Sequence, residues 1–220
     1  KNFVDGFLGR AIDLIVERLR IDRAAVTRDG QPLQTIDHAE LSGAWSGWGV
    51  VLRQLEVKAV DGQINLSGTL ANQTGYPGQA DGWFNWRLGD ITLSGTVNAR
   101  GERGQTRLQL DLDQPSQTRI NATIGQSAEL PWTLAVEIPA FPAQRVFTDS
   151  MLGDLSLQLH GSGDRRHANV DGLLGIGAHS LALEPLRVAL ADKALNIEQL
   201  QISIPGTPGR LLVSGTLDLA

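Results

Sequence analysis

The sequence has no cysteine, few aromatic residues and no long hydrophobic run. Without cysteine, neither a disulfide framework nor a thiolate metal site can form. No run of about 18 apolar residues is present, so these residues contain no predicted membrane-spanning helix. The net charge of −5 argues against a nucleic-acid binder, because such domains carry a basic patch.

The first residue is a lysine, and no signal peptide is visible. We therefore expect the chain to be part of a longer protein, whose membrane anchor or targeting signal lies elsewhere. At 220 residues it is long enough to bury a core.

Alternation of apolar and polar residues fills most of the sequence. Residues 55–59 and 64–70 each place an apolar or glycine residue at every second position, and the Asp61-Gly62 turn separates them. This period of two predicts strands with one apolar and one polar face. The predicted apolar lining comprises Leu55, Val57, Ile64, Leu66, Leu70, Ile91, Leu93, Val97, Leu108, Leu110, Leu112, Leu134, Val136, Leu155, Leu157, Leu159, Leu181, Leu183, Val188, Leu190, Leu200, Ile202, Ile204, Val213, Leu217 and Leu219.

The turn residues and short spacings predict an all-β domain of roughly thirteen mostly antiparallel strands. Helix is restricted to a short N-terminal segment over residues 3–8 and a helical turn within 139–152, which contains two prolines. We expect residues 1–138 and 153–220 to form two sections of one continuous β domain, joined by an irregular crossover at 139–152.

A glycine recurs inside similar strand segments. Residues 66–70, 93–97 and 213–217 read LSGTL, LSGTV and VSGTL, and 159–163 is a looser copy. By parity the glycine falls on the apolar face, where it favours a bend or a close backbone approach. The pattern fits both a wide sheet that curls and the ordinary variation of a β-sandwich.

The sequence predicts no catalytic site, metal site or cofactor. The four histidines lack ligand spacing, although His160 and His167 flank one turn. Asp111 and Asp113 share a strand face that we interpret as solvated. No phosphate-binding loop and no Gly-x-Ser-x-Gly elbow occurs.

Tryptophans occur in two pairs three residues apart, Trp45 with Trp48 and Trp83 with Trp86. On a strand, this spacing places the two rings of a pair on opposite faces. One ring of each pair can then pack while the other caps the rim of the sheet. A platform for stacking sugar rings is an alternative.

The alternation leaves open what covers the apolar face. In a sandwich it is a second sheet, whereas in an open groove it is a ligand. Aromatic residues make up only 5% of the sequence, so the predicted lining is almost wholly aliphatic and suits acyl chains. Exposing a sixteen-carbon chain to water costs on the order of 12 kcal/mol. An uncovered groove would be expected to hold detergent or to dimerise.

Residues 12–70 resemble a repeat of the TamB family, the inner-membrane subunit of the translocation and assembly module in the AsmA-like group of bridge-type lipid transfer proteins. The segments DLIVERLRIDRAAVTRDGQPLQTIDHAELSGAW and LRQLEVKAVDGQINLSGTL carry this resemblance. PWTLAVEI, GDLSLQLHGSGD, HSLALEPLRVALADKALNIEQLQISI and LLVSGTLDL resemble the family again.

The resemblance implies the periplasm of a Gram-negative bacterium, an anchor in the inner membrane and a long curled sheet called a β-taco. It implies that an apolar groove carries phospholipid acyl chains between the inner and outer membranes. An Omp85-type outer-membrane protein is the implied partner, reached through other parts of the full-length protein, of which this chain would be a middle segment.

We therefore expect a non-enzymatic lipid conduit. Two alternatives stay open: a platform that assists the assembly or secretion of outer-membrane β-barrel proteins through open strand edges, and a structural β-repeat without transport.

Overall fold

A computed structural model describes residues 13–28, 31–73, 75, 77–102, 104–142, 153–191 and 194–218. This part of the chain forms fourteen β-strands and no helix. The strands are β1 (Leu14–Arg28), β2 (Gln31–Ser46), β3 (Gly49–Ala59), β4 (Gly62–Ala71), β5 (Gly78–Leu88), β6 (Ile91–Glu102), β7 (Gln105–Gln114), β8 (Thr118–Gly125), β9 (Trp132–Pro142), β10 (Asp154–Gly163), β11 (His167–Ile176), β12 (His179–Ala191), β13 (Ala194–Ser203) and β14 (Arg210–Asp218).

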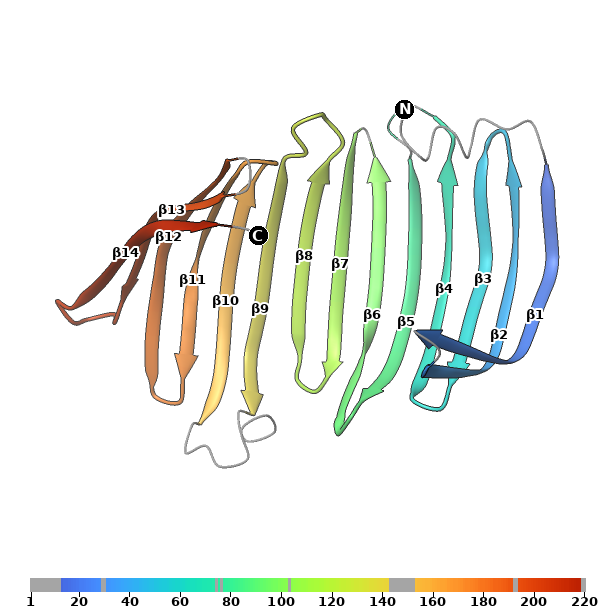
Figure 1. Cartoon of the computed structure of the whole chain (residues 1–220), viewed down its shortest axis with the longest axis horizontal. Helices are drawn as coiled ribbons and strands as arrows, with labels where there is room; N and C mark the ends of the chain where they lie inside the picture. The colour runs from blue at the N-terminus through green and yellow to red at the C-terminus, as the bar shows by residue number, and fades with distance from the viewer. Residues whose placement is uncertain are drawn as a thin grey trace. The chain divides into compact units, whose positions relative to one another are not determined.

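All fourteen strands belong to one sheet, in which each strand is hydrogen-bonded to its neighbours in the sequence (Figure 1). The described strand pairs are antiparallel, as in β4 with β5 and β10 with β11. The predicted all-β, antiparallel curled sheet is therefore confirmed. The number of strands is one more than the roughly thirteen expected.

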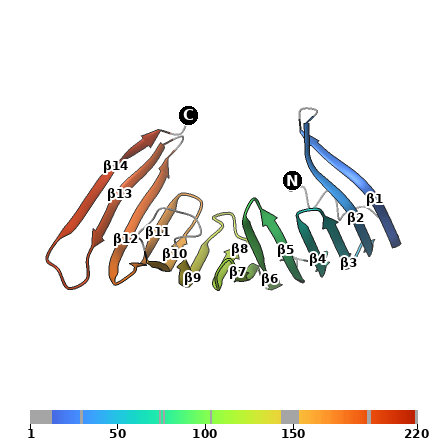
Figure 2. The ribbon, with the colours of Figure 1, turned by 90° about the horizontal axis from the view of Figure 1, so that it is seen from below.

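The chain divides into two compact units. Unit 1 comprises Lys1–Leu108 and Leu112–Pro115, and unit 2 comprises Gln109–Asp111 and Ser116–Ala220, so β7 contributes to both. Within unit 1, the long strands β1 and β2 rise out of the plane of β3 to β6 (Figure 2). Within unit 2, β12 to β14 stand up from β9 to β11 in the same view. The described residues of each unit thus form a single curled layer.

Bulges keep the apolar residues of one strand on one face. Leu52 pairs with Gly68 and Leu55 with Leu66, so three steps along β3 match two along β4. A β-bulge adds one residue to one strand and restores the alternation beyond it. The same irregularity occurs at other places where two apolar residues lie three apart, such as between Val16 and Leu19, Ile138 and Phe141, Leu183 and Leu186, and Ile197 and Leu200.

These bulges also join apolar runs that the alternation alone separates. The sequence pattern treats the run at Leu181 and Leu183 as separate from the run at Val188 and Leu190, whereas both belong to β12. The runs at 195–197 and 200–204 likewise fall within or directly after β13. In each pair, the apolar residues change from odd-numbered to even-numbered positions between the first run and the second. A bulge rather than a turn produces this change.

The expected helix at 3–8 and the expected helical turn lie outside the described residues, apart from 139–142. These four residues belong to β9, which continues to Pro142. β9 and β10, on either side of the undescribed segment 143–152, pair directly with each other. The expected division into groove sections 1–138 and 153–220 stays a prediction.

Glycine on the apolar face is required at some positions and dispensable at others. A Cβ at Gly68 would lie 2.4 Å from the backbone oxygen of Gln79. At this distance the two atoms collide, so the backbone would have to move. At Gly215, in the third copy of the repeated pattern, a Cβ would have nothing within 4 Å. At Gly161 a Cβ would touch the ring of Trp132 at 3.0 Å. The repeated glycines therefore have different local roles.

We expect Gly68→Ala to lower the free energy of unfolding by about 1–3 kcal/mol, because the methyl group collides with the neighbouring backbone. Gly215→Ala is the matched control, with an expected change within about 0.5 kcal/mol. Urea denaturation followed by circular dichroism measures both changes. Equal effects of the two substitutions would contradict the proposed close approach of strands at Gly68.

Candidate apolar surface

The strand registers place the apolar residues of unit 1 on one face. Leu55 pairs with Leu66, and Ile64 pairs with Phe84 on the other side of β4. Because antiparallel partners point to the same side of a sheet, the face can be traced from strand to strand. We call this set apolar face 1: Leu14, Val16, Leu19, Ile21, Ala24, Ile36, Ala39, Leu41, Gly43, Trp45, Val50, Leu52, Leu55, Val57, Ala59, Gly62, Ile64, Leu66, Gly68, Leu70, Gly78, Ala80, Gly82, Phe84, Trp86, Leu88, Ile91, Leu93, Gly95, Val97, Ala99 and Gly101.

Unit 2 has an equivalent face. Leu159 of β10 pairs with Val136 on one side and Gly172 on the other. Apolar face 2 contains Ile120, Ala122, Ile124, Trp132, Leu134, Val136, Ile138, Phe141, Leu155, Leu157, Leu159, Gly161, Gly163, Ala168, Val170, Gly172, Leu174, Ile176, Leu181, Leu183, Leu186, Val188, Ile197, Leu200, Ile202, Leu211, Val213, Gly215 and Leu217.

Among the paired residues traced to these two faces, none is Asp, Glu, Lys or Arg. Beyond the residues named, His179 pairs with Ile176 at the end of β11 and adds one titratable side chain at the edge of apolar face 2. Each face is thus an apolar surface without a fixed charge. Such a surface offers dispersion and hydrophobic contact without directional bonds.

No second layer seals either face within the described part of the chain. Among the residues whose side chains are described, only Gly95, Ser116, Gly161 and Gln201 are buried. None of these four has a large apolar side chain, so every described Leu, Ile and Val stays partly accessible. In a β-sandwich, the inward residues of both sheets would be buried against each other.

The accessible surface area supports the same conclusion. The chain exposes 15182 Å², whereas a compact monomer of 23.7 kDa would expose about 10,000 Å². Soluble monomers rarely expose contiguous apolar patches larger than a few hundred Å². Surfaces of this kind are typical of proteins that bind an apolar partner.

Most of the predicted lining residues belong to these faces. Leu108, Leu110 and Leu112 lie on β7, where Leu110 and Leu112 alternate with Asp111 of the polar face. Ile204 directly follows β13 and is 48% exposed. The side chain of Leu190 and the whole of Leu219 lie outside the described part. The role of these residues as lipid contacts stays a prediction.

The sequence pattern missed the apolar residues of several strands. In β5, Phe84, Trp86 and Leu88 alternate with polar residues, but the glycines before them obscure the run. In β11, Val170, Leu174 and Ile176 are similarly separated by glycines. Counting glycine as compatible with an apolar strand position would have identified both strands.

The opposite face carries ion pairs between neighbouring strands. Arg18 Nε lies 3.0 Å from Glu40 Oε1, and His38 Nδ1 lies 3.0 Å from Asp22 Oδ1. Hydrogen bonds from His38 and Arg20 hold the pKa of Asp22 below its usual value. Exposed ion pairs of this kind contribute little stability. They mark this face as the polar side of the sheet.

Asp111 connects β7 to β8 on the polar side of unit 2. Arg119 Nε donates to Asp111 Oδ1 at 2.9 Å, and Gln109 Nε2 donates to Oδ2 at 2.6 Å. Arg119, followed by Gln109, holds the pKa of the Asp111 carboxyl below its usual value. Asp111 is therefore part of a solvated ion pair, in line with the solvated strand face predicted for Asp111 and Asp113. Its carboxylate already accepts hydrogen bonds from Arg119 and Gln109.

We expect Arg119→Gln to raise the pKa of Asp111 toward its usual value, since the strongest donor is lost. Carboxyl ¹³C chemical shifts followed through an acid titration measure this change. A depressed folded-state pKa adds stability above the unfolded pKa of about 3.9, and this stability disappears as the pH falls through the folded value. Asp111→Asn should therefore weaken the fold at about pH 7 more than at about pH 3. An equal effect at both pH values would contradict this assignment.

Other candidate sites do not assemble. His160 lies 3.9 Å from Asp171, and His167 lies 3.4 Å from Asp164, so each histidine is paired with a carboxylate. In the described residues, no group of three or more His, Cys, Asp or Glu side chains is arranged to hold a metal ion. No described helix is long and apolar enough to cross a membrane.

The two tryptophan pairs behave differently. Trp86 pairs with Leu93 on apolar face 1, and Trp83 pairs with Thr96 on the opposite face. The prediction that these two rings lie on opposite faces is confirmed. Trp48 lies in the turn between β2 and β3 and is 83% exposed, so the strand argument is wrong for the other pair.

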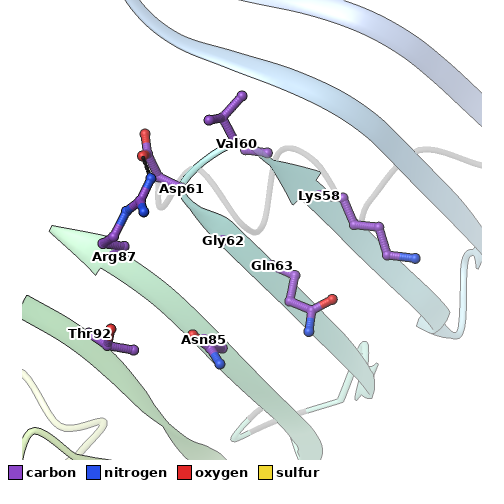
Figure 3. A pocket seen from close by; sticks show the side chains of 9 residues that line it. Lys58, Val60, Asp61, Gly62, Gln63, Asn85, Arg87 and Thr92 are labelled. Atoms are coloured by element: carbon purple, nitrogen blue, oxygen red, sulfur yellow. Dashed lines mark hydrogen bonds and ion pairs between the residues drawn. The ribbon is translucent and has the colours of Figure 1, made fainter.

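Two hollows have linings that belong largely to the polar side of the sheet. The one in unit 1, of about 470 Å³, is lined by Lys58, Ala59, Val60, Asp61, Gly62, Gln63, Asn85, Arg87 and Thr92 (Figure 3). The one in unit 2, of about 260 Å³, is lined by Arg119, Asn121, Ala135, Val136, Glu137, Gln158 and His160. In the first, Arg87 reaches Asp61 at 3.5 Å.

Comparison with known proteins gives one match. The family model described as the N-terminal domain of TamB matches residues 10–220. This description differs from the middle segment that the sequence resemblance suggested. No curated protein and no solved structure matches the chain.

Proposed function

Because this chain belongs to the TamB family, of the translocation and assembly module, we propose that its apolar faces shield phospholipid acyl chains between the inner and outer membranes. The family is inner-membrane anchored with a periplasmic extension, and its members are non-enzymatic bridge or assembly components. The family also implies an Omp85-type partner. We place this chain in the periplasm on that basis.

The observation that carries the proposal is the pair of apolar faces, whose traced residues carry no Asp, Glu, Lys or Arg and over which no described strand packs. Moving one CH₂ group into water costs about 0.8 kcal/mol. A lipid can therefore leave a bilayer only if its tails stay in apolar contact throughout. The apolar side of each strand, made of aliphatic and aromatic residues with interspersed glycines, provides this contact, while the polar face carries the charged side chains.

In the proposed mechanism the protein is a passive surface for the moving lipid. Tails slide along an apolar surface whose contacts are individually weak and equivalent, so no position holds them strongly. A charged residue in their path would have to be desolvated whenever a tail passed, which would create a barrier. The absence of Asp, Glu, Lys and Arg from the traced faces fits this requirement.

Photo-crosslinking tests the contact directly. A photoreactive phenylalanine analogue at Leu66 should capture phospholipid in cells that produce the full-length protein, because Leu66 lies on apolar face 1. The matched control is the adjacent Ser67, which pairs with Asp81 on the polar face. Leu157 and Gln158 form an equivalent pair in unit 2. Equal capture at both members of a pair would contradict the proposal.

A charge placed on the apolar face tests transport. We expect Leu157→Arg in the full-length protein to leave the sheet folded, because Leu157 is not sealed in a core, and to impair lipid delivery. Gln158→Arg places the same charge on the opposite face and should have no effect. Delivery is measured by transfer of labelled phospholipid to the outer membrane. Normal delivery by a folded Leu157→Arg protein would refute the conduit.

A second candidate function is supported by the strand order. β1 and β14 end the described sheet, and an unpaired strand edge can template the strand of a client protein. A platform for assembly or secretion of outer-membrane β-barrels would use these edges. The crosslinking experiment separates the two functions, because clients would be captured along edge strands and lipids across the apolar faces.

A further inference from the structure

Trp83 is the one large apolar side chain on the polar face of β4, β5 and β6. It pairs with Asn65 on one side and Thr96 on the other. Its side chain is 42% exposed, although the opposite face of the same strands offers an apolar surface. The ring is therefore partly exposed on a face that is otherwise polar, and the proposed lipid contact does not use it.

Hydrogen-bonding side chains surround this ring on three strands. The neighbouring rows of paired residues are Ser67, Asp81 and Asn98 on one side and Gln63, Asn85 and Ser94 on the other. Asn98 donates to Asp81. The amides of Asn65, Gln63 and Asn85 make no hydrogen bond with another described residue, so their donors and acceptors are available to a ligand.

The hollow of unit 1 continues this surface toward the strand ends. Gln63 and Asn85 belong both to the row beside Trp83 and to the lining of the hollow (Figure 3). Thr92 adds a hydroxyl on the next strand. At about 470 Å³, the hollow lies within the usual range of small-molecule sites, about 300–1,000 Å³.

We propose that Trp83 and the adjoining hollow form a binding site for the sugar rings of an uncharged glycan. An aromatic ring offers an apolar face on which the C–H face of a pyranose can stack. Amide and hydroxyl side chains around it can pair with the sugar hydroxyls as both donors and acceptors. The ligand class follows from this combination of one stacking ring and several neutral polar groups.

The charges beside the ring disfavour the other polar ligands. The carboxylate of Asp81 repels a phosphate or an acidic sugar at Trp83. The cations of the hollow are already paired, Lys58 with Glu56 and Arg87 with Asp61. A lipid tail is disfavoured on this face, because the neighbouring side chains on β4, β5 and β6 are polar. The site is thus independent of the apolar faces.

The test uses the 220-residue chain with chitohexaose and cellohexaose as probes. Titration followed by the indole N–H signals in two-dimensional NMR should show binding at millimolar concentration, with the Trp83 signal among those that move. Trp83→Ala should weaken binding about tenfold. Trp83→Phe, which keeps an aromatic ring, should retain most of it. The matched control is Trp48→Ala, which removes another exposed ring outside the site and should bind normally.

Circular dichroism confirms that each variant is folded, and Asn85→Ala provides a second variant that leaves the ring in place. Weaker binding by Asn85→Ala and Trp83→Ala, with normal binding by Trp48→Ala, supports the site. Failure of both saccharides to bind the unmodified chain would overturn the proposal, as would normal binding by folded Trp83→Ala. Lipid capture at Leu66 is expected to be unchanged in Trp83→Ala, which separates this result from the test of the conduit.

Discussion

The structure depends on the pleat of the β-strand, which sends successive side chains to opposite sides. Antiparallel pairing passes this division from each strand to the next, because paired residues share a face. One misplaced residue would therefore exchange the apolar and polar faces for the rest of a strand. The bulge between Leu52 and Leu55 prevents such an exchange, and bulges in other strands do the same where apolar residues lie three apart.

The separation of faces allows two different surfaces on one layer of polypeptide. Apolar faces 1 and 2 expose aliphatic and aromatic side chains that an apolar ligand can cover. The opposite side carries ion pairs such as Arg119 with Asp111 and, at Trp83, an isolated aromatic ring among amides. The two surfaces can bind chemically different partners, since the thickness of one sheet separates them and no described residue needs to serve both.

Glycine determines where neighbouring strands approach closely. Gly68 and Gly78 leave room for a neighbouring backbone oxygen that a methyl group would displace. In unit 2, the ring of Trp132 lies over Gly161, so an aromatic side chain occupies the space that a missing Cβ leaves. Gly215 has no such neighbour among the described atoms. A similar local sequence thus meets different surroundings in different strands.

The sequence by itself determined the strand content and the chemistry of the two faces, because alternation is a local property of each strand. It predicted that Leu66 and Ser67 point to opposite sides, and that Trp83 and Trp86 do so too. It could not determine that β12 and β13 each continue through a change of parity, because a bulge depends on the partner strand. Nor could it determine what covers Leu66 or Leu157, since a sandwich and an open sheet share the same alternation. Only the tertiary structure decided that no described strand packs over them.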